Sequence, residues 1–403
     1  MRAAMYLPGL RPESMSWTIY QEFARSLRAE GLSFELLTDA PPSPPNVQGT
    51  TFLPLAAQAS WPDRLAAPLT RNPRLIATAR LLAQYLRSHP KLDLLYCEIA
   101  YPWATAASLA RRMARWRGRL VATPMGEDIL VVPEAGYGAR RHFLPRRALA
   151  WTLRTADAIR CISPMVRERV QAWSDCPAAV IPLNVAPTTI AALGRPPDQR
   201  EAERQAARTA LRQRLGLTSS GLVLSLGRMH PFKGLHFLVR AIASMPDAEL
   251  IIAGPSLSVA GFGDYGTFLR ELATSLGLGD RVHFLGRVPH ERVLQLLAAA
   301  DVLVVPSILE SMNRVCVEAA AAGTPFVVTE TTGIAGYLSE PGVGLTVPPS
   351  DAEALGVKIK EVLTGRWSCQ ATAVSRFVAG FDANVIAPRL IELFEAALGA
   401  ANG

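Results

Sequence analysis

A loop with two cations and two glycines follows a predicted strand in the second half of the chain. The strand is Leu222–Leu226, and the loop runs from Gly227 to Gly234 with Arg228 and Lys233 inside it. Glycines allow close backbone approach and a tight turn into the next helix, whose first N–H groups attract anions. Because ligands of parallel sheets bind beyond the carboxyl ends of the strands, we favour a diphosphate site over two ordinary loop cations.

Two glutamates follow another predicted strand of the second half, Val302–Val305. Glu310 falls in the loop, and Glu318 lies in the apolar stretch Val315–Ala322, where an unpaired carboxylate would cost several kcal/mol. Sugar hydroxyls are suitable donors to such a carboxylate, and the backbone N–H groups at Met312–Arg314 could hold an anionic or hydroxylated ligand. A salt bridge from Glu318 to an internal arginine is the alternative. We consider it weaker, because both carboxylates follow a strand and should converge on one cleft.

Strands that alternate with helices must position these loops. Their near-continuous Val, Ile and Leu content predicts parallel sheets covered by helices on both faces. The predicted strands of the first half are Arg2–Leu7, Ser33–Thr38, Thr50–Leu55, Asp93–Ile99, Leu120–Thr123, Ala158–Ile162 and Ala179–Pro182. Those of the second half are Leu222–Leu226, Ala248–Ala253, Arg281–Leu285, Val302–Val305, Pro325–Val328 and Gly344–Val347.

Two such sets in a chain of 403 residues indicate two doubly wound α/β domains. No strand pattern occurs in the Pro-, Gly-, Arg- and Glu-rich segment around the charged stretch Gln199–Arg214. We therefore expect a first domain over residues 1–185, a linker with a charged helix over 186–220, a second domain over 221–375, and a helical tail over 376–403.

Charge and cysteine content suggest where the protein works. Residues 1–185 hold 23 Lys and Arg against 14 Asp and Glu, whereas the whole chain has 42 against 34. The basic excess therefore lies in the first half. The five cysteines form no C-x-x-C pair, and no apolar run approaches the ~20 residues of a membrane-spanning helix. We expect a cytoplasmic protein whose only membrane contact is peripheral, on the inner face of the cell membrane.

The second half resembles the nucleotide-sugar-binding half of the family 4 (group 1) retaining glycosyltransferases, which have the GT-B fold. The resemblance covers about residues 220–365, and its motifs occur in order. They are Gly227-Arg228 with Lys233-Gly234, the run VHFLGRVP at 282–289, the run ADVLVVPS at 300–307, and Glu310-x7-Glu318 followed by Gly323-Thr324-Pro325. The resemblance implies two Rossmann-like domains that face each other across a cleft, with a C-terminal helix packing back on the N-terminal domain.

The resemblance also implies roles for single residues. Arg228 and Lys233 would neutralise the diphosphate of a nucleoside diphosphate sugar, the donor substrate, without a metal ion or other cofactor. Glu310 would bind hydroxyls of the donor sugar and Glu318 those of the ribose. The remaining donor-side positions are the backbone at Gly227, the base-facing Arg287 and Val288, the pair Met312 and Asn313 with the following Arg314, and Gly333 in a reduced Gly-Gly turn.

The first half resembles the acceptor side of the same family more weakly. Gly9 ends the first strand where the family has a glycine-rich loop, and Thr123–Ile129 resembles its His-Gly-x-Asp segment. Met125 stands at the common histidine position, which leaves Glu127 and Asp128 as the nearest polar candidates to position an acceptor hydroxyl. Asp128 could equally cap the following turn, and we hold the two interpretations equal.

The basic excess also gathers in two aromatic-containing stretches. Their arginines are Arg111, Arg112, Arg115, Arg117 and Arg119, then Arg140, Arg141, Arg146, Arg147 and Arg154. Basic amphipathic stretches with aromatic residues fit an anionic bilayer surface, which we favour over a merely soluble arginine-rich surface. No motif for nucleic-acid binding accompanies the charge, so we expect no nucleic-acid partner.

The leading hypothesis is a retaining hexosyltransferase. It would move a hexose from a UDP- or GDP-linked donor to a glycan or lipid-linked acceptor, in the synthesis of bacterial surface polysaccharide or glycolipid. The alternatives are a nucleotide-sugar epimerase of the same fold and a catalytically silent nucleotide-sugar-binding partner of a glycan assembly complex. The absence of a histidine at position 125 permits the latter.

Overall fold

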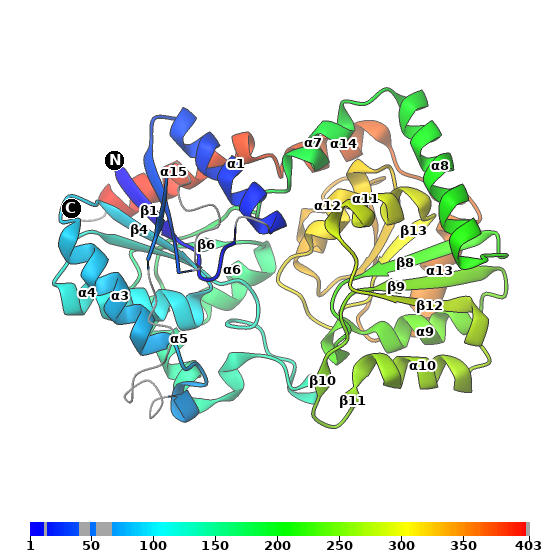
Figure 1. Ribbon diagram of the computed structural model, residues 1–403, viewed down its shortest axis with the longest axis horizontal. Coiled ribbons are helices and arrows are strands. Elements are labelled where there is room, and N and C mark those ends of the chain that lie inside the picture. Colours follow the sequence, from blue (N-terminus) through cyan, green and yellow to red (C-terminus); the bar gives the residue numbers. More distant parts are fainter. Residues whose placement is uncertain (12–13, 40–48, 54–66, 400–403) are drawn as a thin grey trace. The chain divides into compact units, whose positions relative to one another are not determined.

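The computed structural model describes residues 1–11, 14–39, 49–53 and 67–399, which form two compact units (Figure 1). Unit 1 comprises Met1–Val131, Tyr137–Ala186 and Asp382–Gly403, and unit 2 comprises Val132–Gly136 and Pro187–Phe381. Each unit has its own parallel sheet, so the predicted pair of doubly wound α/β domains is confirmed.

The sheet of unit 1 has seven strands in the order β3-β2-β1-β4-β5-β6-β7, all parallel. Its strand order reverses between β1 and β4, which is where open α/β sheets form their ligand crevice. The strands are β1 Arg2–Tyr6, β2 Ser33–Thr38, β3 Thr50–Phe52, β4 Leu94–Glu98, β5 Arg119–Thr123, β6 Ala158–Cys161 and β7 Ala178–Val180.

The sheet of unit 2 has six parallel strands in the order β12-β9-β8-β13-β14-β15, and its order reverses between β8 and β13. The loops that carry Arg228 and Glu310 follow these two neighbouring strands. The strands are β8 Gly221–Leu226, β9 Ala248–Ala253, β12 Val282–Gly286, β13 Val302–Val305, β14 Phe326–Thr329 and β15 Leu345–Val347.

Helices cover both faces of each sheet. In unit 2, α9 and α10 lie on the face opposite α11 and α12 (Figure 1). In unit 1 the helices whose bounds lie within the described residues include α1 Met15–Ala29, α3 Leu75–Ser88, α4 Thr105–Ala114, α5 Phe143–Thr155, α6 Pro164–Gln171 and α15 Ala383–Gly399. Those of unit 2 are α7 Pro187–Leu193, α8 Pro197–Leu215, α9 Leu235–Ala243, α10 Tyr265–Ser275, α11 His290–Ala299, α12 Arg314–Ala321, α13 Ala352–Leu363 and α14 Ala371–Ala379.

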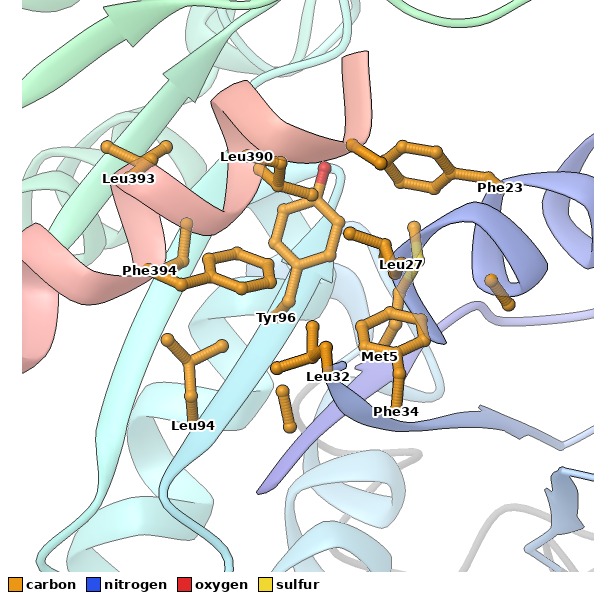
Figure 2. Packing of buried hydrophobic residues seen from close by; sticks show 14 of the residues in the cluster. Met5, Phe23, Leu27, Leu32, Phe34, Leu94, Tyr96, Leu390, Leu393 and Phe394 are labelled. Carbon is orange, nitrogen blue, oxygen red and sulfur yellow. The ribbon is translucent and has the colours of Figure 1, made fainter. Parts of the chain in front are cut away.

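The C-terminal helix α15 packs back on the N-terminal unit, as predicted. Its Phe394 lies 5.6 Å from the ring of Tyr96 on β4, and Leu390 packs beside the same tyrosine (Figure 2). Phe23 and Leu27 of α1 complete this side of the core. All of these side chains are essentially inaccessible to solvent, so the last helix of the chain is part of the central core of unit 1.

Every predicted strand is present, with ends that shift by a few residues. Residues 54–55 of the predicted strand Thr50–Leu55 lie outside the described residues. The sequence did not predict the short antiparallel pair β10 Ser258–Val259 and β11 Gly263–Asp264, because two-residue strands leave no periodic pattern.

The segment predicted as a linker, 186–220, forms helices α7 and α8 and belongs almost entirely to unit 2. Arg208 of α8 forms an ion pair with Asp301, and Arg204 donates to Thr324 over 3.2 Å. The predicted tail begins within α14, which also belongs to unit 2; the return to unit 1 starts at Asp382. None of the helices in the described ranges combines the length and hydrophobicity that crossing a membrane requires.

Candidate functional site

The loop after β8 presents positive charge at the carboxyl end of the sheet. Its backbone is fixed to the neighbouring loop, since the N–H of Gly227 donates to Ala253 and that of Met229 to Pro255. Arg228 is exposed, and within the described residues its side chain has no hydrogen bond or ion pair. Burial, with Arg228 and Lys233 nearby, lowers the pKa of His230 to about 4. His230 therefore stays neutral at physiological pH, so the loop's charge comes from its arginine and lysine.

The loops after β8 and β13 approach each other very closely at Gly234. This residue has a φ of +64°, and a Cβ built on it would lie 1.9 Å from the carbonyl oxygen of Pro306. The N–H of Ile308 donates to the carbonyl of Phe232 over 2.8 Å and joins the same two loops. Only glycine satisfies both the backbone angle and the space at position 234.

Glu310 binds several side chains where the loops after β8 and β13 meet. Its carboxylate forms an ion pair with Lys233, which is mostly buried, and accepts hydrogen bonds from Ser307 Oγ at 2.9 Å and Asn313 Nδ2 at 3.1 Å. The structure therefore brings the predicted Lys233, Glu310 and Asn313 together. The N–H of Gly333 donates to the carbonyl of Glu310 over 2.7 Å, so Gly333 holds the Glu310 loop, and its own N–H is already used.

A small pocket lies between the two loops. The residues that line it include Gly227, Arg228, Lys233, Ser307 and Asn313. The pocket therefore has two cations on one side and a hydroxyl and an amide on the other. This donor set can bind an oxyanion with hydroxyl groups attached nearby.

The first turn of α12 borders the same pocket. Met312 and Asn313 are buried ahead of Arg314, the first helical residue, so the first N–H groups of the helix have no intrahelical acceptor. The Oδ1 atom of Asn313 is buried and has no hydrogen-bond partner within the described ranges. An unpaired buried acceptor indicates that a ligand or water donates to it.

Glu318 lines a different and larger pocket. Its side chain is 6% exposed, and it lines a pocket of about 620 Å³ between α7, α8, α11 and α12. Glu310 does not line this pocket, and the convergence of Glu310 and Glu318 on one cleft stays a prediction. No hydrogen bond or ion pair to the Glu318 carboxylate is present among the described residues, and burial raises its pKa to about 7 against the opposing charge of Arg314.

The loop after β12 holds the predicted base-binding residues and one that the sequence analysis missed. Arg287 is exposed and Val288 is half-buried. His290, the first residue of α11, has its Nε2 atom buried without a partner among the residues described. Burial lowers the pKa of His290. The negative charge of Glu291 opposes this shift, and the positive charge of Arg314 adds to it. A lone histidine after Val-Pro gives no sequence signal, so only its burial identifies it.

The predicted acceptor-side residues all lie at strand ends of unit 1. Gly9 follows β1 and donates its N–H to Asp39 over 2.6 Å. Glu127 is exposed and Met125 half-buried. Asp128 is buried, and its oxygens accept four backbone N–H groups, from Ala100, Met125, Gly126 and Ile129. These hydrogen bonds are those expected if Asp128 caps the turn that follows β5.

A buried charged cluster that the sequence analysis missed lies at the same sheet edge. Arg160 is 1% exposed, with its Nη1 atom 3.6 Å from Glu98 and 2.8 Å from the hydroxyl of Tyr96. Its Nε atom donates to the carbonyl of Ile181, and Tyr20 donates to Glu98. Each charge is paired and hydrogen-bonded, as buried charges require. The cluster ties β4 and β6 to the segment that leaves unit 1.

These two α/β units, each with a parallel sheet whose strand order reverses at a switch point, define a two-domain doubly wound α/β fold. Two family models match the chain, "Glycosyltransferase Family 4" over residues 17–187 and "Glycosyl transferases group 1" over residues 207–373. The matches cover most of both units, and the chain belongs to the group 1, family 4 glycosyltransferases.

Curated relatives match part of the chain. A D-inositol 3-phosphate glycosyltransferase from Mycobacteroides abscessus is 35% identical over 193 residues, which are 47% of this chain and 43% of the relative. A glycogen synthase from Mycobacterium tuberculosis is 30% identical over 195 residues, 48% of this chain and 46% of the relative. The matched region thus spans less than half the length of these relatives.

Solved structures match along the whole chain. A sucrose-phosphate synthase from Thermosynechococcus elongatus aligns with a TM-score of 0.74 at 21% identity over 99% of both chains. The Anabaena protein HepE, solved in complex with UDP and glucose, aligns with a TM-score of 0.72 at 21% identity over 98% of this chain and 99% of that one. These similarities establish the GT-B fold.

The substitution Gly234→Ala should destabilise unit 2. A positive φ costs alanine about 1 kcal/mol, and the contact with Pro306 adds to this, so we expect a loss of at least ~2 kcal/mol in the free energy of unfolding. Urea unfolding followed by circular dichroism measures it. Gly277→Ala is the matched control, because Gly277 has a φ of +68° with no atom within 4 Å of its built Cβ. Equal losses in the two variants would contradict the close approach.

The substitution Glu318→Gln should change how stability depends on pH. The pKa of Glu318 is about 7 in the folded protein and ordinarily 4.5, so between these values the folded state binds more protons than the unfolded state. The free energy of unfolding therefore falls as pH rises through this window, by up to about 3 kcal/mol.

Glu318→Gln removes this decline. Relative to the wild type, the variant should be more stable at pH 8 than at pH 5, measured by urea unfolding at both values. The exposed Glu353→Gln is the control and should leave the pH dependence unchanged. A Glu318→Gln profile parallel to that of the wild type would show that the carboxylate titrates normally.

Proposed function

We propose that the protein transfers a hexose from a nucleoside diphosphate sugar to a hydroxyl of a glycan or lipid-linked acceptor, with retention of the anomeric configuration. The observation that carries the proposal is the pocket between the loops after β8 and β13. It joins Arg228 and Lys233 to Asn313 and the Glu310 loop at the switch point of the unit 2 sheet.

The two cations suit the leaving diphosphate. As the bond from the sugar to the diphosphate breaks, negative charge grows on the diphosphate, and a well-placed donor can stabilise it by ~3–4 kcal/mol. Lys233 is held by Glu310, and Arg228 is unpaired and exposed. Arg228 can therefore bind the diphosphate at no internal cost, whereas Lys233 must share its charge between Glu310 and the ligand.

The polar groups other than Arg228 and Lys233 suit the sugar and the nucleoside of the donor. Glu310 accepts hydrogen bonds from Ser307 and Asn313, and hydroxyls of the donor sugar are donors of the same kind. Glu318, buried without a partner within the described part of the chain, is proposed to accept from the ribose. Arg287 and Val288 are proposed to contact the base, with His290 behind them.

The structure of HepE with UDP and glucose supports a UDP-linked donor ahead of a GDP-linked one. In our proposal no enzyme carboxylate attacks the sugar and no metal ion takes part. Instead the nucleotide diphosphate leaves on the face from which the acceptor arrives and takes the acceptor's proton. Catalysis would then consist of positioning and of electrostatic stabilisation of the leaving group.

A panel of nucleotides and nucleotide sugars should identify the donor. At 100 times its Kd, a ligand adds about 2.7 kcal/mol of stability, which a thermal-shift measurement resolves. We expect UDP compounds to shift the wild-type midpoint and ADP and dTDP compounds to leave it unchanged. Arg228→Ala should lower kcat about 100- to 1000-fold with a wild-type melting midpoint, because the Arg228 side chain has no hydrogen bond or ion pair among the described residues.

Arg240→Ala is the control, since Arg240 is an exposed arginine on the adjacent α9. Normal turnover in Arg228→Ala would contradict the assignment of the diphosphate site. A nucleotide shift with neither transfer nor donor hydrolysis would instead identify a silent binding partner.

The acceptor side and an anionic membrane surface are proposed for unit 1. Gly9, Met125 and Glu127 lie at its strand ends. Arg111 and Arg119 are engaged by Asp157 at 2.7 and 2.8 Å, which accounts for part of the basic excess structurally. The arginines that remain exposed are Arg112, Arg115, Arg117, Arg141, Arg146, Arg147 and Arg154.

Exposed apolar side chains accompany these arginines. Phe143 is 71% exposed at the start of α5, beside Leu144 and below the guanidinium of Arg147 at 5.7 Å. Met113, at the end of α4, is also exposed. Large apolar groups among exposed arginines suit insertion into the headgroup layer of an anionic bilayer.

Flotation with vesicles tests the membrane proposal. The protein should float with phosphatidylglycerol vesicles at low salt, and much less at high salt or with phosphatidylcholine. Phe143→Ser with Leu144→Ser should weaken binding about tenfold or more, because each side chain gains ~1.5–3 kcal/mol on burial. Val357→Ser is the control, because Val357 is an apolar residue of unit 2 whose exposed fraction, 51%, lies between those of Phe143 and Leu144. Equal flotation of both variants would contradict the proposed surface.

A further inference from the structure

The pocket that Glu318 lines in unit 2 runs along one face of α8. The α8 residues that line it recur every three or four positions from Arg200 to Arg214, a spacing that places them on one side of the helix. These two arginines are 14 residues apart, so the face is about 21 Å long. The pocket is therefore an elongated groove along α8.

The groove exists because small residues face one another across it. The middle of the α8 face consists of Ala206, Ala207, Ala210 and Leu211, and the C-terminal end of α12 contributes Ala321 and the following Ala322. Alanines leave empty the volume that larger side chains would fill between packed helices. At about 620 Å³ the pocket has the size of small-molecule sites.

Positive charge borders this apolar middle. Arg200, Arg214 and Arg292 line the pocket and have no side-chain hydrogen bond or ion pair among the described residues. The Nε atom of Arg200 is buried without a partner in the described structure. By contrast, Arg195 pairs with Glu203 and Arg204 bonds to Thr324. A buried guanidinium nitrogen with no acceptor calls for an anion.

Two further buried polar groups face the pocket without a partner in the described part of the chain. Thr189 of α7 is fully buried, and its Oγ1 atom makes no hydrogen bond. Glu318 is 6% exposed and has no hydrogen bond or ion pair. Buried polar groups are ordinarily satisfied by protein, water or ligand. Thr189 and Glu318 both line the pocket, so a molecule with polar atoms could satisfy them there.

We infer that this pocket binds an amphipathic anion, an alkyl chain with a single carboxylate or phosphate head. The chain would lie along the alanine face of α8, and the head would contact an arginine at one end. This site goes beyond the proposed transferase activity, because α7 and α8 contribute none of the residues of the diphosphate pocket. Glu318 is common to both proposals, so occupancy of the groove should alter donor affinity, and the converse must hold equally.

Calorimetric titration of the full chain with dodecanoate, below its micellar concentration, tests the inference. We expect saturable binding of one molecule, with dodecyl phosphate as a second arm that distinguishes the two heads. Dodecanol should bind at least tenfold more weakly, because it has no charge for the arginines. Arg200→Ala with Arg214→Ala should weaken dodecanoate binding about tenfold or more.

Ala207→Leu provides a second, independent variant. It fills the groove without removing a charge and should abolish binding while leaving the UDP-induced thermal shift in place. The exposed Arg366→Ala is the control and should bind normally. Absence of dodecanoate binding, binding unaffected by Ala207→Leu, or binding lost in Arg228→Ala would overturn the inference. Failure of the nucleotide panel alone would overturn only the transferase proposal, since dodecanoate binding is measured without nucleotide.

Discussion

The candidate site depends on the contact between two strand-end loops at Gly234. Because this residue has no side chain, the loop after β8 reaches the carbonyl of Pro306, and the hydrogen bond between Phe232 and Ile308 fixes the two loops together. Lys233 is thereby placed against Glu310. A wider separation would leave two partly buried charges without partners, which costs more free energy than the glycine's lost chain entropy.

The contact between the two loops also explains how Lys233, Arg228 and Glu310 can lie close together. Lys233 is neutralised by Glu310, which also accepts from Ser307 and Asn313, whereas Arg228 remains exposed and unpaired in the described structure. The loop thus carries one charge that is satisfied internally and one that is available to a ligand. Neutral His230 adds no repulsion, because its pKa lies near 4.

Much of the fold could be predicted from the sequence, because fully buried parallel strands require continuous Val, Ile and Leu. Strands such as Ala248–Ala253 and Val302–Val305 were predicted to the residue. The cations and Glu310 were also predictable, since strand-end loops at a switch point are where ligands bind. The sequence could not show the surroundings of Glu318, which depend on α7 and α8 packing over α11 and α12. Nor could it show the Glu98–Arg160 pair, whose members are 62 residues apart and meet only through sheet order.

The position of α15 has a consequence for synthesis. The chain leaves unit 1 at Ala186 and returns only at Asp382, and the returning helix places Leu390 and Phe394 against Tyr96. At typical elongation rates, roughly 10–40 s separate these two points on the ribosome. Throughout that interval the apolar surface around Tyr96 has no covering helix. The rest of unit 2 apart from Val132–Gly136 lies between these two crossings. Unit 2 can therefore complete its core first, so the N-terminal unit is the later of the two to mature.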